Sequence, residues 1–181
     1  NPSQTGFPCR RHLGGLADST ANDHDAVDFG TAPAVGRIGA GRAFNGGATD
    51  YLEVPYDASL AWPDDAITLS AWVQHDSEQF FRAFLVHPVP DTSENAIYLG
   101  MNGAVAYARF GPMGSAETFG PTLGAATWTW LTATYDGTQI DLYADGQLVD
   151  TEPWSDPPLA STDSLFIGAD RDGGTGAPNA A

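Results

Sequence analysis

Residues 128–151, WTWLTATYDGTQIDLYADGQLVDT, decide the fold of this chain. Three short runs rich in β-branched and aromatic residues are separated here by Asp136-Gly137 and Asp145-Gly146. An Asp-Gly pair accepts the positive φ angles that a two-residue hairpin turn requires, because glycine has no Cβ. The stretch therefore predicts a meander of three antiparallel strands with a primed turn at each Asp-Gly pair.

Alternation of apolar and polar residues extends this pattern outward along the chain. In the segment 67–73, Ile67, Leu69, Ala71 and Val73 share one face of a strand, and Trp72 lies on the other. No segment has the apolar spacing of an amphipathic helix. The expected strands are 42–44, 51–54, 67–74, 82–86, 96–101, 105–110, 128–135, 139–144, 147–151 and 164–167. The pattern predicts an all-β sandwich or barrel.

The charge of the chain excludes several classes of partner. Its 181 residues include 23 Asp and Glu, seven Arg and no Lys, for a net charge of −16. Such a surface repels nucleic acids and anionic membranes. No apolar run approaches the roughly 18 residues of a membrane span. The acidity is explained equally by adaptation to salty surroundings that contain calcium and by a simple requirement for solubility.

The length suits one domain, expected over residues 11–181, with residues 1–10 as an N-terminal extension or linker. The chain starts at Asn1 without a signal-peptide pattern, so we expect a processed or excised piece of a longer protein. The single cysteine, Cys9, cannot form an intrachain disulfide. It is a thiol of no consequence, half of an intermolecular bridge, or the partner of a cysteine that lies outside this piece of the protein.

Eight motifs follow one another in the order of a known family. They are 18–22 (DSTAN), 36–46 (GRIGAGRAFNG), 50–55 (DYLEVP), Ser59-Leu60, 67–73 (ITLSAWV), 127–137 (TWTWLTATYDG), 140–146 (IDLYADG) and 165–169 (LFIGA). Over residues 11–170 the chain resembles laminin-G-like members of the concanavalin A-like lectin/glucanase superfamily. The resemblance implies a two-sheet antiparallel jelly-roll sandwich with one curved sheet whose concave face is free for ligands.

One departure from this family concerns the closing strand. The family usually adds a strand after the Ile-Gly segment, but residues 170–181 show no such run, and only 7–13 could serve as a first strand. Either the chain has been shortened, or another chain supplies the strand. The second alternative predicts a homo-oligomer or filament formed by strand addition, because an unpaired sheet edge accepts a foreign strand.

The sequence does not predict an enzyme. Glucanases of the superfamily carry closely spaced acidic residues on one strand, so that two carboxylates flank a glycosidic bond. Asp141 has no acidic neighbour at a spacing of two, and Glu53 and Glu94 are isolated. A Gly-x-Ser-x-Gly nucleophile motif is also absent.

Calcium is the expected cofactor. Hard cations bind carboxylate, amide and carbonyl oxygens in loops, and residues 18–25 offer four such side chains. The segment 18–22 resembles the calcium loop of the family, which implies Asp18 and Asn22 as ligands, with Asp170 as a contribution from near the last strand. The alternative is a solvated acidic turn whose Asp and Asn side chains cap the local backbone.

Aromatic residues are the candidates for ligand contact. Trp62, Trp130, Trp154 and Tyr107 could form a platform for a sugar ring or pack in the core, since tryptophan is often partly buried. We expect Trp72 and Trp128 in the core. The four histidines have no ligand spacing and are expected at the surface or at the edge of the core (His12, His24, His75 and His87).

Together these observations predict a secreted or cell-surface recognition module that binds glycans or a protein surface and is stabilised by calcium. The alternative is a structural subunit of a surface appendage or adhesin, completed by a strand from a neighbouring chain.

Overall fold

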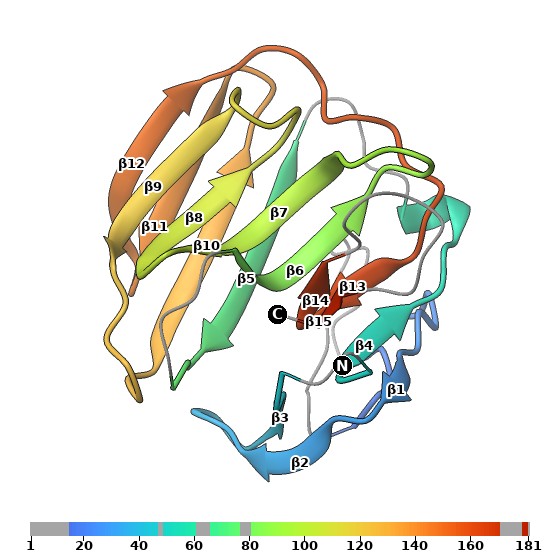
Figure 1. Ribbon diagram of the computed structural model, residues 1–181. Coiled ribbons are helices and arrows are strands. Elements are labelled where there is room, and N and C mark those ends of the chain that lie inside the picture. Colours follow the sequence, from blue (N-terminus) through green and yellow to red (C-terminus); the bar gives the residue numbers. More distant parts are fainter. Residues whose placement is uncertain (1–14, 47–48, 61–65, 77–80, 171–178, 181) are drawn as a thin grey trace.

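The computed structural model describes residues 15–46, 49–60, 66–76, 81–170 and 179–180. It confirms the all-β prediction (Figure 1), since the only helical element among these residues is one 3-10 turn, η1 (Ala58–Leu60). The strands are β1 (Val27–Phe29), β2 (Ala32–Val35), β3 (Ala40–Ala43), β4 (Tyr51–Val54), β5 (Ile67–Val73), β6 (Arg82–Pro88), β7 (Asn95–Asn102), β8 (Val105–Arg109), β9 (Glu117–Thr122), β10 (Thr129–Tyr135), β11 (Gln139–Ala144), β12 (Gln147–Pro153), β13 (Leu165–Ile167), β14 (Ala169–Asp170) and β15 (Asn179–Ala180).

Two antiparallel sheets form the layers of the sandwich. The larger has seven strands in the order β1-β4-β13-β6-β7-β8-β9, and the smaller has four in the order β12-β11-β10-β5. Two strand pairs, β2-β3 and β14-β15, stand outside both sheets. No helix in the described part of the chain is long and apolar enough to cross a membrane.

The core lies between the two layers, where the alternating side chains meet. Ile97, Leu99 and Met101 of β7 point into it and are completely buried. Leu131 and Ala133 of β10 meet them from the other sheet, as the alternation predicts. These residues belong to a main core cluster under β7, β8 and β10. A separate side cluster includes Leu52, Val54, Leu60 and Leu165.

The two Asp-Gly turns differ from each other. Asp145 and Gly146 both have positive φ angles (50° and 78°), which confirms the predicted primed turn. At the other position, only Gly137 is positive (87°), and three residues separate β10 from β11. The prediction of a two-residue turn was wrong there. The carboxylate of Asp136 accepts hydrogen bonds from the Thr138 hydroxyl and the Gln139 amide and so closes the longer loop.

Five strands, β1, β2, β9, β14 and β15, were not predicted from the sequence. β9 contains Gly120 and Pro121, which argue against a strand in the middle of a sheet. The structure places β9 at the edge of the seven-stranded sheet, where the missing N–H of a proline is tolerated. β1 pairs with β4 and forms the opposite edge, in a region that the sequence presents as irregular.

Candidate functional site

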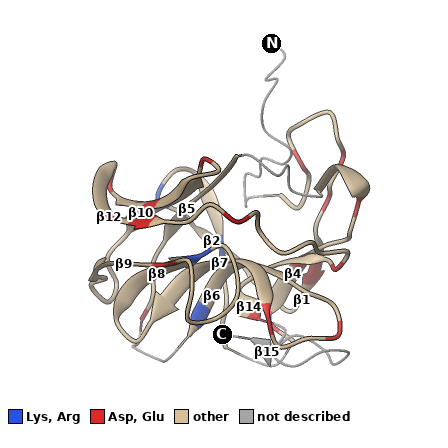
Figure 2. Cartoon of the chain, turned by 90° about the horizontal axis from the view of Figure 1, so that it is seen from above, with Lys and Arg blue, Asp and Glu red and all other residues tan. Residues whose placement is uncertain are grey.

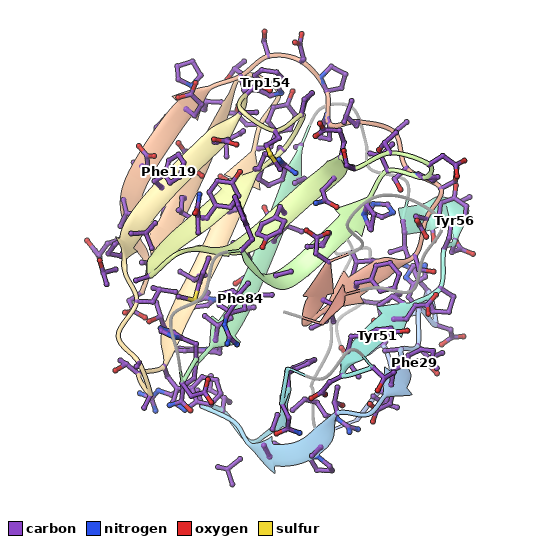
Figure 3. All side chains as sticks on the ribbon, viewed as in Figure 1. Phe29, Tyr51, Tyr56, Phe84, Phe119 and Trp154 are labelled. Carbon is purple, nitrogen blue, oxygen red and sulfur yellow. The ribbon has the colours of Figure 1, made fainter. Side chains whose placement is uncertain are left out.

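The outer face of the seven-stranded sheet carries a grid of polar and aromatic side chains on β7, β8 and β9. Arg109 of β8 stands opposite Tyr98 of β7 on one side and Glu117 of β9 on the other. Two residues before Arg109 on the same strand, Tyr107 stands opposite Phe119 of β9, and the centroids of their rings lie 5.3 Å apart. Figure 3 shows Phe119 at this end of the sheet. These side chains share a face because residues two apart on a strand point the same way.

Gly100 and Phe81 determine how the two tyrosines lie. A Cβ on Gly100 would clash with the backbone carbonyl oxygen of Arg82 and come within 2.6 Å of Cε1 of Tyr98, so glycine is required for β6 and the Tyr98 ring to lie this close to β7. The Phe81 ring meets Tyr98 and Tyr107 edge-on, with centroid distances of 6.4 and 6.0 Å. The stack buries both tyrosines to about 2% exposure or less, although they lie outside the sandwich core.

A small pocket of about 100 Å³ opens among these residues, and we call it the sheet-face pocket. It is lined by Phe81, Ser93, Asn95, Tyr98, Tyr107, Arg109, Met113 and Asp170. Ligand pockets usually measure roughly 300–1,000 Å³. The sheet-face pocket is therefore large enough for one end of a ligand and not for a whole one.

Three buried polar atoms of the pocket have unused hydrogen-bonding capacity. Asn95 Oδ1, Tyr98 Oη and Arg109 Nε have no hydrogen-bond partner among the described residues. The three residues are only 4%, 2% and 2% exposed. A buried polar atom without a partner costs roughly 1–3 kcal/mol, so a bound molecule that satisfies these atoms would recover that energy.

The electrostatics of the pocket keep both tyrosine hydroxyls protonated. Burial raises the pKa of Tyr98 far above its usual value, and Asp170 raises it further. Burial also raises the pKa of Tyr107, whose hydroxyl donates to Glu117 Oε1 at 2.8 Å. Neither hydroxyl ionises at neutral pH, and Tyr98 Oη is therefore able to donate as well as accept.

Charged groups of both signs border the pocket. Arg109 forms no ion pair with a carboxylate of the described chain. Asp170 lies across the pocket and accepts a hydrogen bond from Asn95 Nδ2 at 3.3 Å. The pocket thus presents a cationic donor, an anionic acceptor and two neutral polar groups within one small space.

Of the four aromatic residues proposed for ligand contact, the structure places only Tyr107 in this pocket. Trp130 is 42% exposed on the outer face of the other sheet, where it stacks on Trp72 at 6.2 Å. Trp154 packs half-buried against the main core, over Gly111. Trp62 lies outside the described residues. The three described residues, Tyr107, Trp130 and Trp154, therefore do not form one platform.

Two further predictions about side chains need correction. Trp72, expected in the core, is half-buried on the outer face, because β5 points Ile67, Leu69, Ala71 and Val73 inward. Trp128, also expected in the core, is half-buried and does not belong to the main core cluster. His24, His75 and His87, expected at the surface or core edge, are 6% exposed or less. In each histidine, Nε2 forms a hydrogen bond with an oxygen: Ser59 Oγ for His24, the Leu123 carbonyl for His75 and the Asp163 carbonyl for His87. His12 lies outside the described residues.

The predicted calcium residues are engaged in other contacts. Asp18 Oδ1 accepts from the Thr20 amide, and Asp18 Oδ2 accepts from the Thr20 hydroxyl and the His24 amide. The backbone N–H of Asn22 donates to the Thr20 hydroxyl, and Asp170 borders the sheet-face pocket. No group of three His, Cys, Asp or Glu in the described part of the chain could hold a metal. The hydrogen bonds of Asp18 agree with the acidic-turn alternative, and calcium binding stays a prediction.

Sequence reasoning missed Asn95, Tyr98 and Arg109. The available signal was in β8, where Tyr107 and Arg109 alternate with Ala106, Ala108 and Phe110. An arginine within so apolar a run, in a chain with seven arginines, indicates a buried charge with a specific role.

Solved structures with the same fold include several binding domains. Domain 4 of AbnA, a GH43 extracellular arabinanase from Geobacillus stearothermophilus solved with arabinotriose, matches at a TM-score of 0.66 and 17% identity, over 92% of this chain and 82% of that one. The binding domain of Paraclostridial Mosquitocidal Protein 1 matches at 0.72 and 12% identity, over 94% and 44%. The ligand-binding domain of botulinum neurotoxin serotype D, solved with N-acetylneuraminic acid, matches at 0.64 and 12% identity, over 91% and 42%.

The chain spans less than half the length of these two toxin domains. At such low identities the likeness is one of fold. A comparison with curated protein sequences found no match. Residues 45–180, about three quarters of the chain, match the family Laminin_G_3, described as the concanavalin A-like lectin/glucanases superfamily. The resemblance is thereby confirmed, and the chain belongs to this superfamily.

Proposed function

We propose that this chain is a non-catalytic, extracellular module that binds a neutral glycan, with one end of the sugar in the sheet-face pocket. The observation that carries the proposal is the convergence of Asn95 Oδ1, Tyr98 Oη and Arg109 Nε, all buried and without a partner in the described chain, on one pocket. Native structures rarely leave such atoms unsatisfied, and a cluster of them points to a bound molecule or to ordered water.

The chemistry of the pocket suits sugar hydroxyls. Each hydroxyl both donates and accepts, and the pocket offers a donor in Arg109, acceptors in Asn95 and Asp170, and a group of either kind in Tyr98. Phe81 adds an apolar surface against which the C–H groups of a sugar could pack. The net charge of −16 disfavours polyanionic ligands at long range, which is why a neutral glycan is preferred.

Binding without hydrolysis is favoured by the distribution of carboxylates. Glycoside hydrolysis requires two carboxyl groups, about 5 Å or 6.5–9.5 Å apart, on either side of the bond. Among the described lining residues, Asp170 is the one acidic group, and Asn95 donates a hydrogen bond to it. The sugar complexes of the arabinanase domain and of the neurotoxin domain support sugar binding by this fold, and the extracellular arabinanase supports the proposed location.

The test is a screen of neutral and acidic oligosaccharides, arabinotriose and N-acetylneuraminic acid included, followed by titration of each hit. Tyr98→Phe should weaken binding while the protein stays folded. Trp130→Ala is the matched control, because it removes an exposed aromatic ring from the opposite sheet and should leave binding unchanged. If Trp130→Ala abolishes binding and Tyr98→Phe does not, the sheet-face pocket is not the site. If no glycan binds, the proposed function fails.

A further inference from the structure

A large groove separates the β2-β3 hairpin from β5, on the opposite side of the seven-stranded sheet from the sheet-face pocket. It measures about 1530 Å³. Its lining comes from the hairpin on one side and from β5 on the other, and continues onto the outer face of β10 and β11 at Trp130, Thr132 and Tyr143. We call it the interstrand groove. It arises because a layer of seven strands faces a sheet of only four, and Figure 1 shows the hairpin standing apart from that sheet.

Both sides of the interstrand groove are strand edges. Among the described strands, β5 pairs only with β10, and β3 pairs only with β2. The free edge of a strand presents a row of N–H and C=O groups that can pair with another strand. A segment lying between β3 and β5 would find such groups on each side, so the groove favours an extended peptide over a compact ligand.

The base of the groove is apolar and incompletely covered. Phe84 and Leu85 of β6, Ile167 of β13 and Phe44 after β3 line it, and all four are only half-buried. Leu85 packs against both the main core and the side cluster, which otherwise stay separate. An inserted strand with apolar side chains on one face would cover these residues and join the two clusters into one core.

The charges beside the groove differ from those of the whole molecule. Acidic residues greatly outnumber basic ones along the described chain (Figure 2). The described lining of the groove reverses this, because it includes Arg37, Arg42 and Arg82 against Asp76 alone. Arg42 is paired with Asp28 at 2.8 Å, whereas Arg37 is exposed and lies 5.5 Å from the Trp72 ring. An inserted strand with carboxylates on its outer face would complement this local charge.

We propose that the interstrand groove accepts a β-strand from another polypeptide, with alternating apolar residues facing the base and acidic residues facing Arg37. A strand as long as the seven residues of β5 would extend about 23 Å. The added strand would pair with β5 and extend the four-stranded sheet toward β3. This proposal is independent of the glycan proposal, since the two sites lie on opposite faces of the seven-stranded sheet.

The experiment uses the full chain and a synthetic peptide of about nine residues that alternates valine with threonine or glutamate. One control peptide has the same composition with the valines contiguous, and a second carries proline at two of the polar positions. Binding is followed by fluorescence anisotropy of the labelled peptide, and protection of β3 and β5 amides by hydrogen exchange. The alternating peptide should bind and protect both strands from exchange. Each control should bind at least about tenfold more weakly, the first because its valines no longer lie on one face of the strand and the second because proline has no N–H to donate.

The charge part of the proposal has its own matched pair of variants. Arg37→Gln and Leu148→Glu each make the protein more negative by one charge, but Leu148 lies 55% exposed on β12, at the far edge of the same sheet. Arg37→Gln should weaken the glutamate peptide about fivefold, and Leu148→Glu should have little effect. Equal effects of the two variants would overturn the role of Arg37.

Three outcomes would overturn the proposal as a whole. The three peptides could bind equally well, which would make the groove a non-specific apolar surface. Light scattering could show dimers whose β5 amides are protected without peptide, which would make a second copy the occupant. The β5 amides of a monomer could already be protected, which would place a segment of this chain in the groove.

Discussion

The two buried tyrosines of the sheet-face pocket allow a sharp test of the site, because each can lose its hydroxyl without losing its ring. Tyr98 Oη has no hydrogen-bond partner among the described residues. Tyr107 Oη donates to the carboxylate of Glu117 at 2.8 Å. The rings lie 5.5 Å apart and are equally buried, so Tyr98→Phe and Tyr107→Phe differ mainly in the hydrogen bond that is removed.

The expected changes in the free energy of unfolding have opposite signs. Tyr107→Phe removes a hydrogen bond to a charged group and should cost about 1.5–3 kcal/mol. Tyr98→Phe removes a buried hydroxyl that gains nothing from the protein. It should therefore leave stability unchanged or raise it by about 1 kcal/mol. Urea unfolding followed by tryptophan fluorescence measures both, and with an m-value of about 2–3 kcal/mol/M the loss in Tyr107→Phe lowers the midpoint by about 0.5–1.5 M urea.

Glycan binding should respond in the reverse order. Tyr98→Phe removes a group proposed to contact the sugar, so the dissociation constant should rise about five- to tenfold, equivalent to about 1–1.4 kcal/mol. In Tyr107→Phe the change should be smaller, because that hydroxyl is already engaged by Glu117. If Tyr98→Phe destabilises the protein as much as Tyr107→Phe does, the Tyr98 hydroxyl has a partner inside the folded chain. The argument for the pocket then fails.

Three further predictions concern stability. Burial lowers the pKa of His87 below its unfolded value of 6.5, so the unfolded chain binds the extra proton more readily. Stability should fall as pH drops below about 6.5, and His87→Gln should flatten this dependence in thermal scans from about pH 7 to 5. Gly146→Ala should cost about 1 kcal/mol in urea unfolding, because φ is +78° there and no neighbour lies within 4 Å to repack; no loss would contradict the primed turn. Asp18→Asn turns one carboxylate oxygen into an NH2 that cannot accept from the Thr20 hydroxyl or the His24 amide, and it should cost about 1–2 kcal/mol; a calcium-dependent rise in Tm that this variant abolishes would establish the predicted calcium site.

The sequence predicted the fold well because the fold follows from local patterns. Alternation in β5 and β10 assigns each side chain to a face, and Asp145-Gly146 has one favourable turn geometry. β9 shows the limit of this reasoning. A strand with Gly120 and Pro121 is stable only because it lies at a sheet edge, and its place in the sheet follows from tertiary pairing.

The site was harder to predict than the fold, because its residues come from separate parts of the chain. Phe81 precedes β6, Asn95 begins β7, and Arg109 and Asp170 end β8 and β14, so only the tertiary fold brings these residues to one pocket. Tryptophans drew attention as candidate sugar platforms, yet Trp154 fills a space against the main core. Tyr98 looks like an ordinary core residue within an apolar run, and only its position on the outer face reveals an unused hydroxyl.

At both proposed sites, a face of the seven-stranded sheet departs from the usual pattern of a sandwich. In a closed sandwich, the outer face of a sheet is polar and solvated while the inner face is apolar and covered. Here the outer face buries Tyr98 and Arg109, and the inner face leaves Phe84 and Leu85 half-buried. The outer face therefore lacks a polar partner for its buried groups, and the inner face lacks an apolar partner for its half-buried side chains. The chemistry of the two contacts differs, so Tyr98→Phe should weaken the glycan and not the peptide, and Arg37→Gln should do the reverse.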